Sequence, residues 1–186
     1  MTVRRLSLLG LAVLATGCMG TTSSRTPAVV VAPAPTPAPE RWIRVRKTER
    51  TLALYEGSEV RKVYSVVLGK DPVPAKLYQG DHRTPEGEYH IVKKYYHPFW
   101  SRFLMLDYPT PYNREMYAWS VERGLVPGRG RGTRGIGGAV GIHGTEYESL
   151  NRLGKDWTEG CVSLLNRDID ELYDLVPVGT RVVIEH

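Results

Sequence analysis

The chain has 186 residues, of which 41% are hydrophobic and 24% charged, and this ordinary globular composition excludes wholesale disorder, collagen-like repeats and coiled coils. Two cysteines are too few for a disulfide-dense scaffold or a four-cysteine zinc module. Three of the 25 basic residues precede residue 40, which leaves 22 basic against 20 acidic residues in the remainder. Because phosphate-backbone binding needs a basic excess, this near balance argues against a nucleic-acid partner.

The first residues have the pattern of a secretion signal. Arg4 and Arg5 form a short positive region before the apolar run 6–15. That run is too short to span a hydrocarbon core of about 30 Å. We therefore predict a signal peptide over residues 1–17.

The end of this signal resembles that of bacterial lipoproteins. Residues 14–18 read LATGC, and in such lipoproteins a small residue precedes a cysteine that is lipidated and becomes the mature N-terminus. The resemblance predicts a lipid anchor on Cys18, whereas an ordinary cleaved signal with an incidental cysteine is the alternative. Residue 19 is Met rather than Asp, which by the sorting of such lipoproteins indicates a periplasmic protein held at the outer membrane.

A proline-rich stretch follows. Residues 18–39 contain five of the thirteen prolines, alternating with Ala and Val, and show no apolar period that could form a core. Polyproline segments of this kind are extended and semi-rigid. We interpret residues 18–39 as a tether and residues 40–186 as a single folded domain.

The folded domain is predicted to be mainly β. Short runs of β-branched and aromatic residues with period-two alternation lie between Gly and Pro residues. The predicted strands are 42–47, 51–55, 60–68, 88–95, 103–108, 116–121, 139–143, 160–165 and 181–185. The Glu56-Gly57-Ser58 segment is a predicted hairpin turn.

Two short helices are predicted in the C-terminal third. Thr145 and Glu148 form a capping-box pattern, and Gly154 can end that helix in the left-handed conformation. Asp168 and Glu171 open the second helix. Each helix carries an apolar stripe expected in the core. The stripes comprise Tyr147, Leu150 and Leu153 in the first helix, and Ile169, Leu172, Tyr173 and Val176 in the second.

A glycine-rich segment, residues 124–144, carries Arg129, Arg131 and Arg134. One interpretation is a mobile, charged loop. The other is a substrate-facing loop, because guanidinium groups bind carboxylates through paired hydrogen bonds. The segment lacks the spacing of a phosphate-binding loop, which disfavours nucleotide binding.

One histidine and one cysteine have the pattern expected for nucleophilic catalysis. His143 ends a predicted strand, and Cys161 follows Gly160 after 17 intervening residues that include a predicted helix. A neighbouring imidazole assists thiol ionisation, and a thiolate is a strong nucleophile. Backbone N–H groups near Gly160 and Cys161 could stabilise an oxyanion. The alternative is that Cys161 is a small buried hydrophobic residue and His143 a hydrogen-bonded structural one.

These residues belong to a wider resemblance. His-Gly-Thr at 143–145, followed by Thr-x-Gly-Cys-Val at 158–162, is similar to the YkuD-type L,D-transpeptidase catalytic domain of bacterial cell-wall enzymes. The upstream segment 80–89, GDHRTPEGEY, resembles a further motif of that family. The resemblance covers most of residues 40–186 and implies a YkuD-like β-sandwich or barrel-like fold.

The resemblance also implies roles for individual residues. Cys161 would be the nucleophile and His143 the general base and acid, oriented by the backbone carbonyl of Gly144. Candidate substrate-binding residues are Arg129, Arg131, Arg134 and Thr158. Two positions depart from the common family pattern: Glu159 stands where many members have His, and Ser163 where many have Arg. A carboxylate at 159 would raise the thiol pKa if it lay close.

The expected function is a peptidoglycan L,D-transpeptidase that forms a cysteine thioester with a stem peptide and passes it to an amine acceptor, with a protein side chain as one possible acceptor. Neither a cofactor nor a metal is expected. Two alternatives remain at this stage: an amidase or carboxypeptidase that hydrolyses the same acyl-enzyme, and a non-catalytic wall-binding lipoprotein.

Overall fold

The structure is a computed structural model that describes residues 40–129 and 132–186. The predicted signal peptide, the lipidation site Cys18 and the tether lie outside the described residues. Within them, no helix has the length and apolar character needed to cross a membrane.

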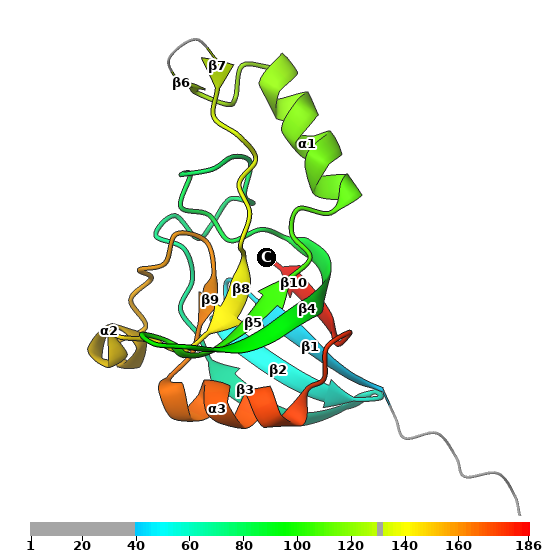
Figure 1. Cartoon of the computed structure of the whole chain (residues 1–186), viewed down its shortest axis with the longest axis vertical. Helices are drawn as coiled ribbons and strands as arrows, with labels where there is room; N and C mark the ends of the chain where they lie inside the picture. Colours follow the sequence, from blue (N-terminus) through cyan, green and yellow to red (C-terminus); the bar gives the residue numbers. More distant parts are fainter. Residues whose placement is uncertain (1–39, 130–131) are drawn as a thin grey trace, which may run out of the picture. The chain divides into compact units, whose positions relative to one another are not determined.

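An eight-stranded sheet dominates the folded unit, with the order β3-β2-β1-β10-β4-β5-β8-β9 (Figure 1). A separate two-stranded hairpin is formed by β6 and β7. The strands are β1 (Arg41–Arg46), β2 (Thr51–Glu56), β3 (Glu59–Ser65), β4 (Gly87–His97), β5 (Ser101–Leu106), β6 (Gly128–Arg129), β7 (Gly132–Thr133), β8 (Gly141–His143), β9 (Val162–Ser163) and β10 (Arg181–Glu185). This architecture confirms the prediction of a mainly β domain.

Alternation of buried and exposed residues explains the middle of the sheet. In β1 and β10, which pair in parallel, every second side chain points into the core, as Ile43 and Val182 illustrate. The turn after Glu56 joins β2 to β3, with Gly57 at φ 61°, which confirms the predicted hairpin. Strands from the two ends of the chain therefore form one continuous core.

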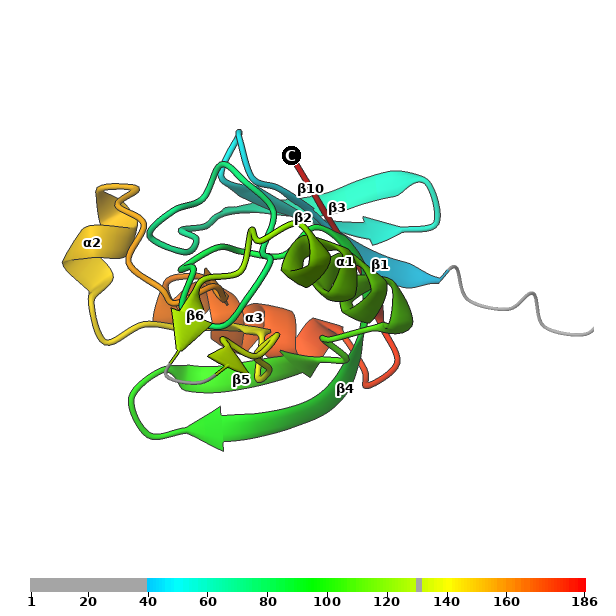
Figure 2. The ribbon, with the colours of Figure 1, turned by 90° about the horizontal axis from the view of Figure 1, so that it is seen from above.

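The sheet curls until its two ends meet. Just after β3, Val67 exchanges two backbone hydrogen bonds of 2.8 and 2.9 Å with Ser163 in β9, the strand at the opposite end of the sheet order. The view from above shows the curl (Figure 2). Because β9 is held on both sides, the residues that immediately precede it have a fixed position.

Helix α3 (Asn166–Leu175) lies along β5 and β8 and closes one end of the core. Its apolar stripe is buried at Ile169, Leu172 and Val176, which confirms the core role predicted for it. Tyr173 is partly buried against the same cluster. The helix thus supports the strand that carries His143.

Helix α2 (Glu148–Arg152) corrects the sequence interpretation. No side chain caps it, because Thr145 Oγ1 instead accepts a hydrogen bond from the Tyr147 N–H at 2.8 Å. The predicted core stripe is wrong at two positions, since Tyr147 and Leu153 are exposed. The buried residue of this helix is Asn151.

Helix α1 (Pro111–Glu122) replaces a predicted strand at 116–121. Thr110 and Asn113 form a reciprocal capping box, and Pro111 occupies the first turn, where its missing N–H costs nothing. The helix lies at the opposite end of the folded unit from α3, together with β6 and β7 (Figure 1). A hydrogen bond from the Tyr117 hydroxyl to the carbonyl of Arg134, the residue after β7, links α1 to this pair of strands.

Candidate functional site

His143 ends β8 and is almost completely buried, at 1% exposure. Its ring stacks against Trp100 at 4.4 Å between centroids, and Phe103 and Trp157 lie at 5.5 and 5.9 Å. Three aromatic side chains therefore fix the plane of the imidazole.

The hydrogen bonding of the ring determines its tautomer. Nδ1 lies 2.6 Å from the Gly144 carbonyl oxygen, which can only accept, so Nδ1 carries the proton and Nε2 has a free lone pair. Burial lowers the pKa of His143 to about 4, with a smaller contribution from nearby His97 and against the opposing effect of the Gly144 carbonyl. The imidazole is therefore neutral at pH 7 and able to accept a proton at Nε2.

Gly144 must be glycine at this position. A Cβ there would lie 2.3 Å from Asn166 Oδ1 and 2.4 Å from the Trp100 carbonyl. Its N–H donates to that same Trp100 carbonyl at 2.9 Å. The backbone after β8 is thus clamped between β5 and α3, which sets the direction of the carbonyl that His143 uses.

Cys161 immediately precedes β9, which pairs in parallel with β8 so that His143 is level with Ser163. Helix α2 lies within the 17-residue connection, so the chain leaves β8 and returns to the same side of the sheet, as the spacing predicted. The side chains of His143 and Cys161 line one cavity of about 400 Å³.

The thiol rests in its neutral form. Its Sγ donates a weak hydrogen bond of 3.7 Å to the Ala139 carbonyl. Cys161 as a whole is only partly buried, but protein atoms surround the sulfur closely, and burial raises the thiol pKa to about 11. The Gly141 N–H and the Lys76 ammonium oppose this rise. The pair is therefore a neutral thiol and a neutral imidazole rather than an ion pair.

The turn before Cys161 depends on Gly160, whose φ is +136° and where a Cβ would lie 2.6 Å from the Arg83 carbonyl. Its N–H donates to Thr158 Oγ1 at 3.1 Å, and that hydroxyl donates to the Cys161 carbonyl at 2.8 Å. The Gly160 N–H and the Thr158 hydroxyl are thus both engaged within the turn. Among the described residues, the N–H of Cys161 itself has no acceptor.

Cys161 lies between two cavities. The first, of about 400 Å³, contains His143 and the aromatic side chains of Trp100, Tyr147 and Trp157. The second, of about 320 Å³, is lined by Lys76 and by the backbone of glycines 80, 137, 138 and 160. The two cavities share Cys161 and Glu159. Cys161 therefore lies where the two cavities meet.

These segments match a known family. The model of the YkuD L,D-transpeptidase catalytic domain matches residues 40–184. The chain belongs to the YkuD family of L,D-transpeptidase catalytic domains. Peptidoglycan stem peptides are the substrates that fit this family.

Relatives of known sequence are identical to this L,D-transpeptidase domain at about a third of the aligned positions. YqjB of Bacillus subtilis strain 168 is 31% identical over 144 residues, which cover 77% of this chain and 70% of that protein. ErfK/SrfK of Escherichia coli K12 is 34% identical over 119 residues, covering 60% and 36% of the two chains.

Solved structures support the fold. The helical cell shape determining protein Pgp2 of Campylobacter jejuni superposes with a TM-score of 0.59 at 22% identity, over 81% of this chain and 49% of that one. An L,D-transpeptidase from Enterococcus faecium gives 0.52 at 14% identity, over 78% and 50%. The chain thus spans about half the length of these two proteins.

The two departures from the common L,D-transpeptidase pattern have structural explanations. The carboxylate of Glu159 is held by hydrogen bonds from Lys70 and His82, which lower its pKa. The raised pKa of Cys161 therefore comes from burial and not from Glu159. Ser163 is fully buried, and its hydroxyl donates to the Gly144 carbonyl at 2.9 Å.

Lys76 is a site residue that the sequence did not reveal. Its ammonium donates to Asp81 Oδ1 at 2.7 Å and to the Tyr78 carbonyl at 3.1 Å, and the side chains of Lys76 and Asp81 are 5% and 1% exposed. Burial alone would raise the pKa of Asp81, but Lys76 and the backbone N–H groups of Tyr78 and Leu77 lower it overall. The sequence signal for this pair is the short spacing between Lys76 and Asp81, which is the second residue of the GDHRTPEG segment.

The three predicted arginines remain substrate-binding candidates. Arg134 is exposed, and its guanidinium lies beside Gly80, at the edge of the 320 Å³ cavity. Arg131 and the side chain of Arg129 lie outside the described residues. The described residues contain no cluster of three or more His, Cys, Asp or Glu that could bind a metal ion.

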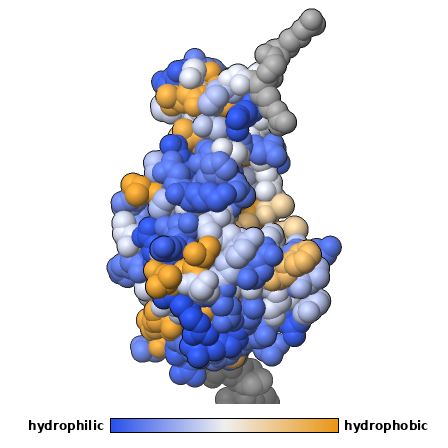
Figure 3. All heavy atoms as spheres, turned by 90° about the vertical axis from the view of Figure 1, so that its left-hand side faces the viewer, coloured by the Kyte–Doolittle hydropathy of each residue, from blue (hydrophilic) through white to orange (hydrophobic). Residues whose placement is uncertain are grey.

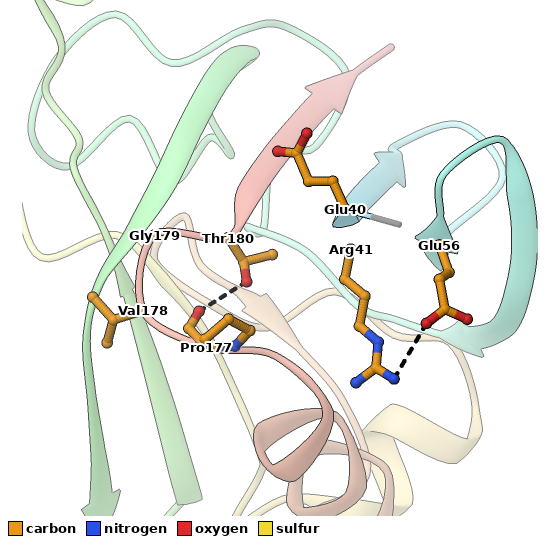
Figure 4. A pocket seen from close by; sticks show the side chains of 7 residues that line it. All are labelled: Glu40, Arg41, Glu56, Pro177, Val178, Gly179 and Thr180. Carbon is orange, nitrogen blue, oxygen red and sulfur yellow. Dashed lines mark hydrogen bonds and ion pairs between the residues drawn. The ribbon is translucent and has the colours of Figure 1, made fainter. Parts of the chain in front are cut away.

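A further cavity, of about 500 Å³, lies away from this site (Figure 4). Its lining comprises Glu40, Arg41, Glu56, Pro177, Val178, Gly179 and Thr180. The guanidinium of Arg41 pairs with Glu56 and donates to the Leu175 carbonyl, so its charge is already compensated within the protein. This cavity has the greater volume, but it contains neither a cysteine nor a histidine, and its Thr180 hydroxyl donates to the Pro177 carbonyl at 2.8 Å. The residues at Cys161 are therefore the better candidates for catalysis.

Proposed function

We propose that this chain is a cysteine acyltransferase that joins peptidoglycan stem peptides to amines. The observation that carries the proposal is the neutral His143 imidazole, with Nε2 free, in the same cavity as the neutral Cys161 thiol. A neutral pair needs no prior ionisation, because the proton can move from Sγ to Nε2 as the sulfur attacks.

The first half-reaction forms the thioester. Sγ of Cys161 attacks the carbonyl of the L-centre that precedes a terminal D-residue, and Nε2 of His143 takes the thiol proton. The tetrahedral oxyanion accepts a hydrogen bond from the free N–H of Cys161. When the intermediate collapses, the C–N bond breaks and the proton on Nε2 passes to the leaving amine.

The second half-reaction restores the enzyme. An acceptor amine gives a proton to Nε2 and attacks the thioester carbonyl, a new C–N bond forms, and the C–S bond breaks with return of the proton to sulfur. Both amines exchange a proton with His143, so both use the 400 Å³ cavity. The acyl part of the donor then occupies the 320 Å³ cavity on the other side of Cys161.

Product analysis tests this proposal. The full-length protein is incubated with tetrapeptide muropeptides, with and without an amine acceptor such as a free D-amino acid, and the products are identified by mass spectrometry. We expect acceptor-dependent exchange that the Cys161→Ala variant lacks. Release of the D-residue without transfer would indicate the hydrolase instead. An active Cys161→Ala variant would contradict the role of the thiol.

The site of action is part of the same proposal. A lipid on Cys18 and the tether of residues 18–39 would hold the domain in the periplasm at the outer membrane, within reach of the wall and of protein acceptors. Mass spectrometry of the N-terminal peptide from membrane fractions would test this. An unmodified Cys18, or a soluble wild-type protein, would contradict the anchor.

A further inference from the structure

A chain of buried hydrogen bonds ends on the carbonyl that holds His143. Trp157 Nε1 donates to Asn151 Oδ1 at 2.9 Å, and Asn151 Nδ2 donates to Ser163 Oγ at 3.1 Å. Ser163 Oγ donates to the Gly144 carbonyl at 2.9 Å. The same carbonyl accepts the hydrogen bond from Nδ1 of His143 at 2.6 Å. We call the side chains of Trp157, Asn151 and Ser163 the relay.

The direction of every bond in the relay is fixed by chemistry. An indole nitrogen can only donate, so the atom of Asn151 that faces Trp157 must be the amide oxygen. The amide nitrogen then faces Ser163 and donates to it, which directs the hydroxyl proton to the Gly144 carbonyl. Because a carbonyl can only accept, both Ser163 and His143 donate to it.

The relay is well placed to act on the imidazole. Ser163 is fully buried and Asn151 is 8% exposed, so solvent offers little competition for these bonds. Neither Asn151 nor Ser163 lines either of the two cavities at Cys161. Trp157, in contrast, lines the 400 Å³ cavity and packs edge-on against His143. The relay thus joins the cavity wall to the support of the imidazole.

We infer that Asn151 and Ser163 are positioning residues, which hold the Gly144 carbonyl so that His143 keeps its proton on Nδ1 and presents a bare Nε2 to the thiol. This inference rests on the proposed role of His143 as general base. Ser163 occupies the position where many members of the family have Arg, and an arginine could not relay a hydroxyl proton in this way.

The alternative is that the two residues only fill the space between α2 and β9 and satisfy buried polar groups. A purely structural role would affect the free energy of unfolding but not the tautomer of His143. The tautomer is therefore the decisive quantity, and it can be measured without substrate.

The test uses full-length protein and three single variants. Ser163→Ala removes the donor to Gly144, and Ser163→Thr keeps a hydroxyl. Ser149→Ala, at an exposed serine of α2, is the matched control. Thermal unfolding establishes that each variant is folded. Long-range ¹H–¹⁵N spectra then report the His143 tautomer, and iodoacetamide alkylation of Cys161 at pH 7 reports thiol activation.

We expect wild type, Ser163→Thr and Ser149→Ala to hold the proton on Nδ1. In Ser163→Ala we expect a mixture of tautomers and an alkylation rate about five- to tenfold lower, since one buried hydrogen bond is worth about 1 kcal/mol. A folded Ser163→Ala protein with an unchanged tautomer and an unchanged rate would overturn the inference. The tautomer result stands even if no transpeptidase product is found, so failure of the proposed function is distinguishable.

Asn151→Asp provides a second test. A carboxylate at 151 accepts from Trp157 and also from Ser163, so the Ser163 proton turns away from the Gly144 carbonyl and an oxygen lone pair faces it. We expect a folded Asn151→Asp protein to show the same mixed tautomer and the same slow alkylation as Ser163→Ala. Wild-type behaviour in a folded Asn151→Asp protein would contradict the inference.

Discussion

Nδ1 of His143 lies 2.6 Å from the Gly144 carbonyl oxygen, and yet the pKa of this ring is lowered to about 4. Burial among aromatic side chains outweighs the hydrogen bond that favours the protonated form. The base of the site is therefore neutral over a wider pH range than an ordinary histidine.

This pKa predicts the pH profile of thiol modification. The rate of Cys161 alkylation by iodoacetamide, assisted by His143, should change little between pH 8 and pH 5 and fall as the imidazole is protonated near pH 4. An ordinary histidine would lose activity near its unperturbed pKa of about 6.5. A midpoint above pH 6 in the measured profile would show that His143 is not desolvated as described.

The same pKa predicts how stability depends on pH. The unfolded chain binds a proton at His143 near pH 6.5, whereas the folded protein binds it only near pH 4, so the free energy of unfolding falls as the pH drops through this window. Between pH 7 and pH 4.5 the loss is about 2 kcal/mol. Urea unfolding of wild type and His143→Gln at both pH values measures it. An equal loss in the two proteins would contradict this assignment.

Gly160→Ala should destabilise the protein. A residue with a side chain is strained at φ +136°, and its Cβ would lie 2.6 Å from the Arg83 carbonyl. We expect the free energy of unfolding to fall by about 2–4 kcal/mol, and the alkylation rate to fall because Cys161 shifts. Gly154→Ala is a useful control, since Gly154 also has a positive φ but nothing lies within 4 Å of the added Cβ. Similar losses in both variants would argue against the steric explanation.

Variants of the Lys76–Asp81 pair distinguish its contribution to folding stability from the effect of the Lys76 charge on the thiol pKa of Cys161. Lys76→Met leaves the buried Asp81 carboxylate unpaired and should cost about 3–5 kcal/mol. The double variant Lys76→Met/Asp81→Leu removes the unpaired charge but also the acceptor of the Leu77 and Tyr78 N–H groups, so it should recover only part of that stability. It still lacks the ammonium that lowers the thiol pKa. Alkylation of Cys161 should therefore remain several-fold slower than in wild type. A double variant as reactive as wild type would exclude an electrostatic role for Lys76.

Much of the site could be predicted because it follows from local sequence. His143 ends β8 and Cys161 immediately precedes the adjacent strand β9, since the 17-residue connection returns to the same side of the sheet. The apolar residues of α3 recur with helical spacing and form its buried face, so this helix could also be predicted from the sequence. Each of these features is encoded within about twenty residues.

The remainder depends on tertiary contacts that leave no local pattern. Helix α1 is exposed on most sides and buries only Ser120, so it has no apolar stripe with a helical period, and residues 116–121 resemble a strand. Asn151, rather than the apolar stripe of α2, is buried because its amide links Trp157 to Ser163. Only the folded arrangement shows that Ser120 and Asn151 are the buried residues of these helices.

The surface also carries no local pattern of this kind. On the face shown in Figure 3, apolar residues form small groups that are separated by hydrophilic residues.

The mass of the protein after reaction with a tetrapeptide donor tests the central claim most directly. In the absence of an amine acceptor, wild-type protein should gain the mass of the donor minus that of the free D-amino acid that is released. Peptide mapping should place the addition on Cys161 as a thioester that hydroxylamine removes. Cys161→Ala should gain nothing. An adduct on another residue, or the same gain in the Cys161→Ala variant, would contradict the account.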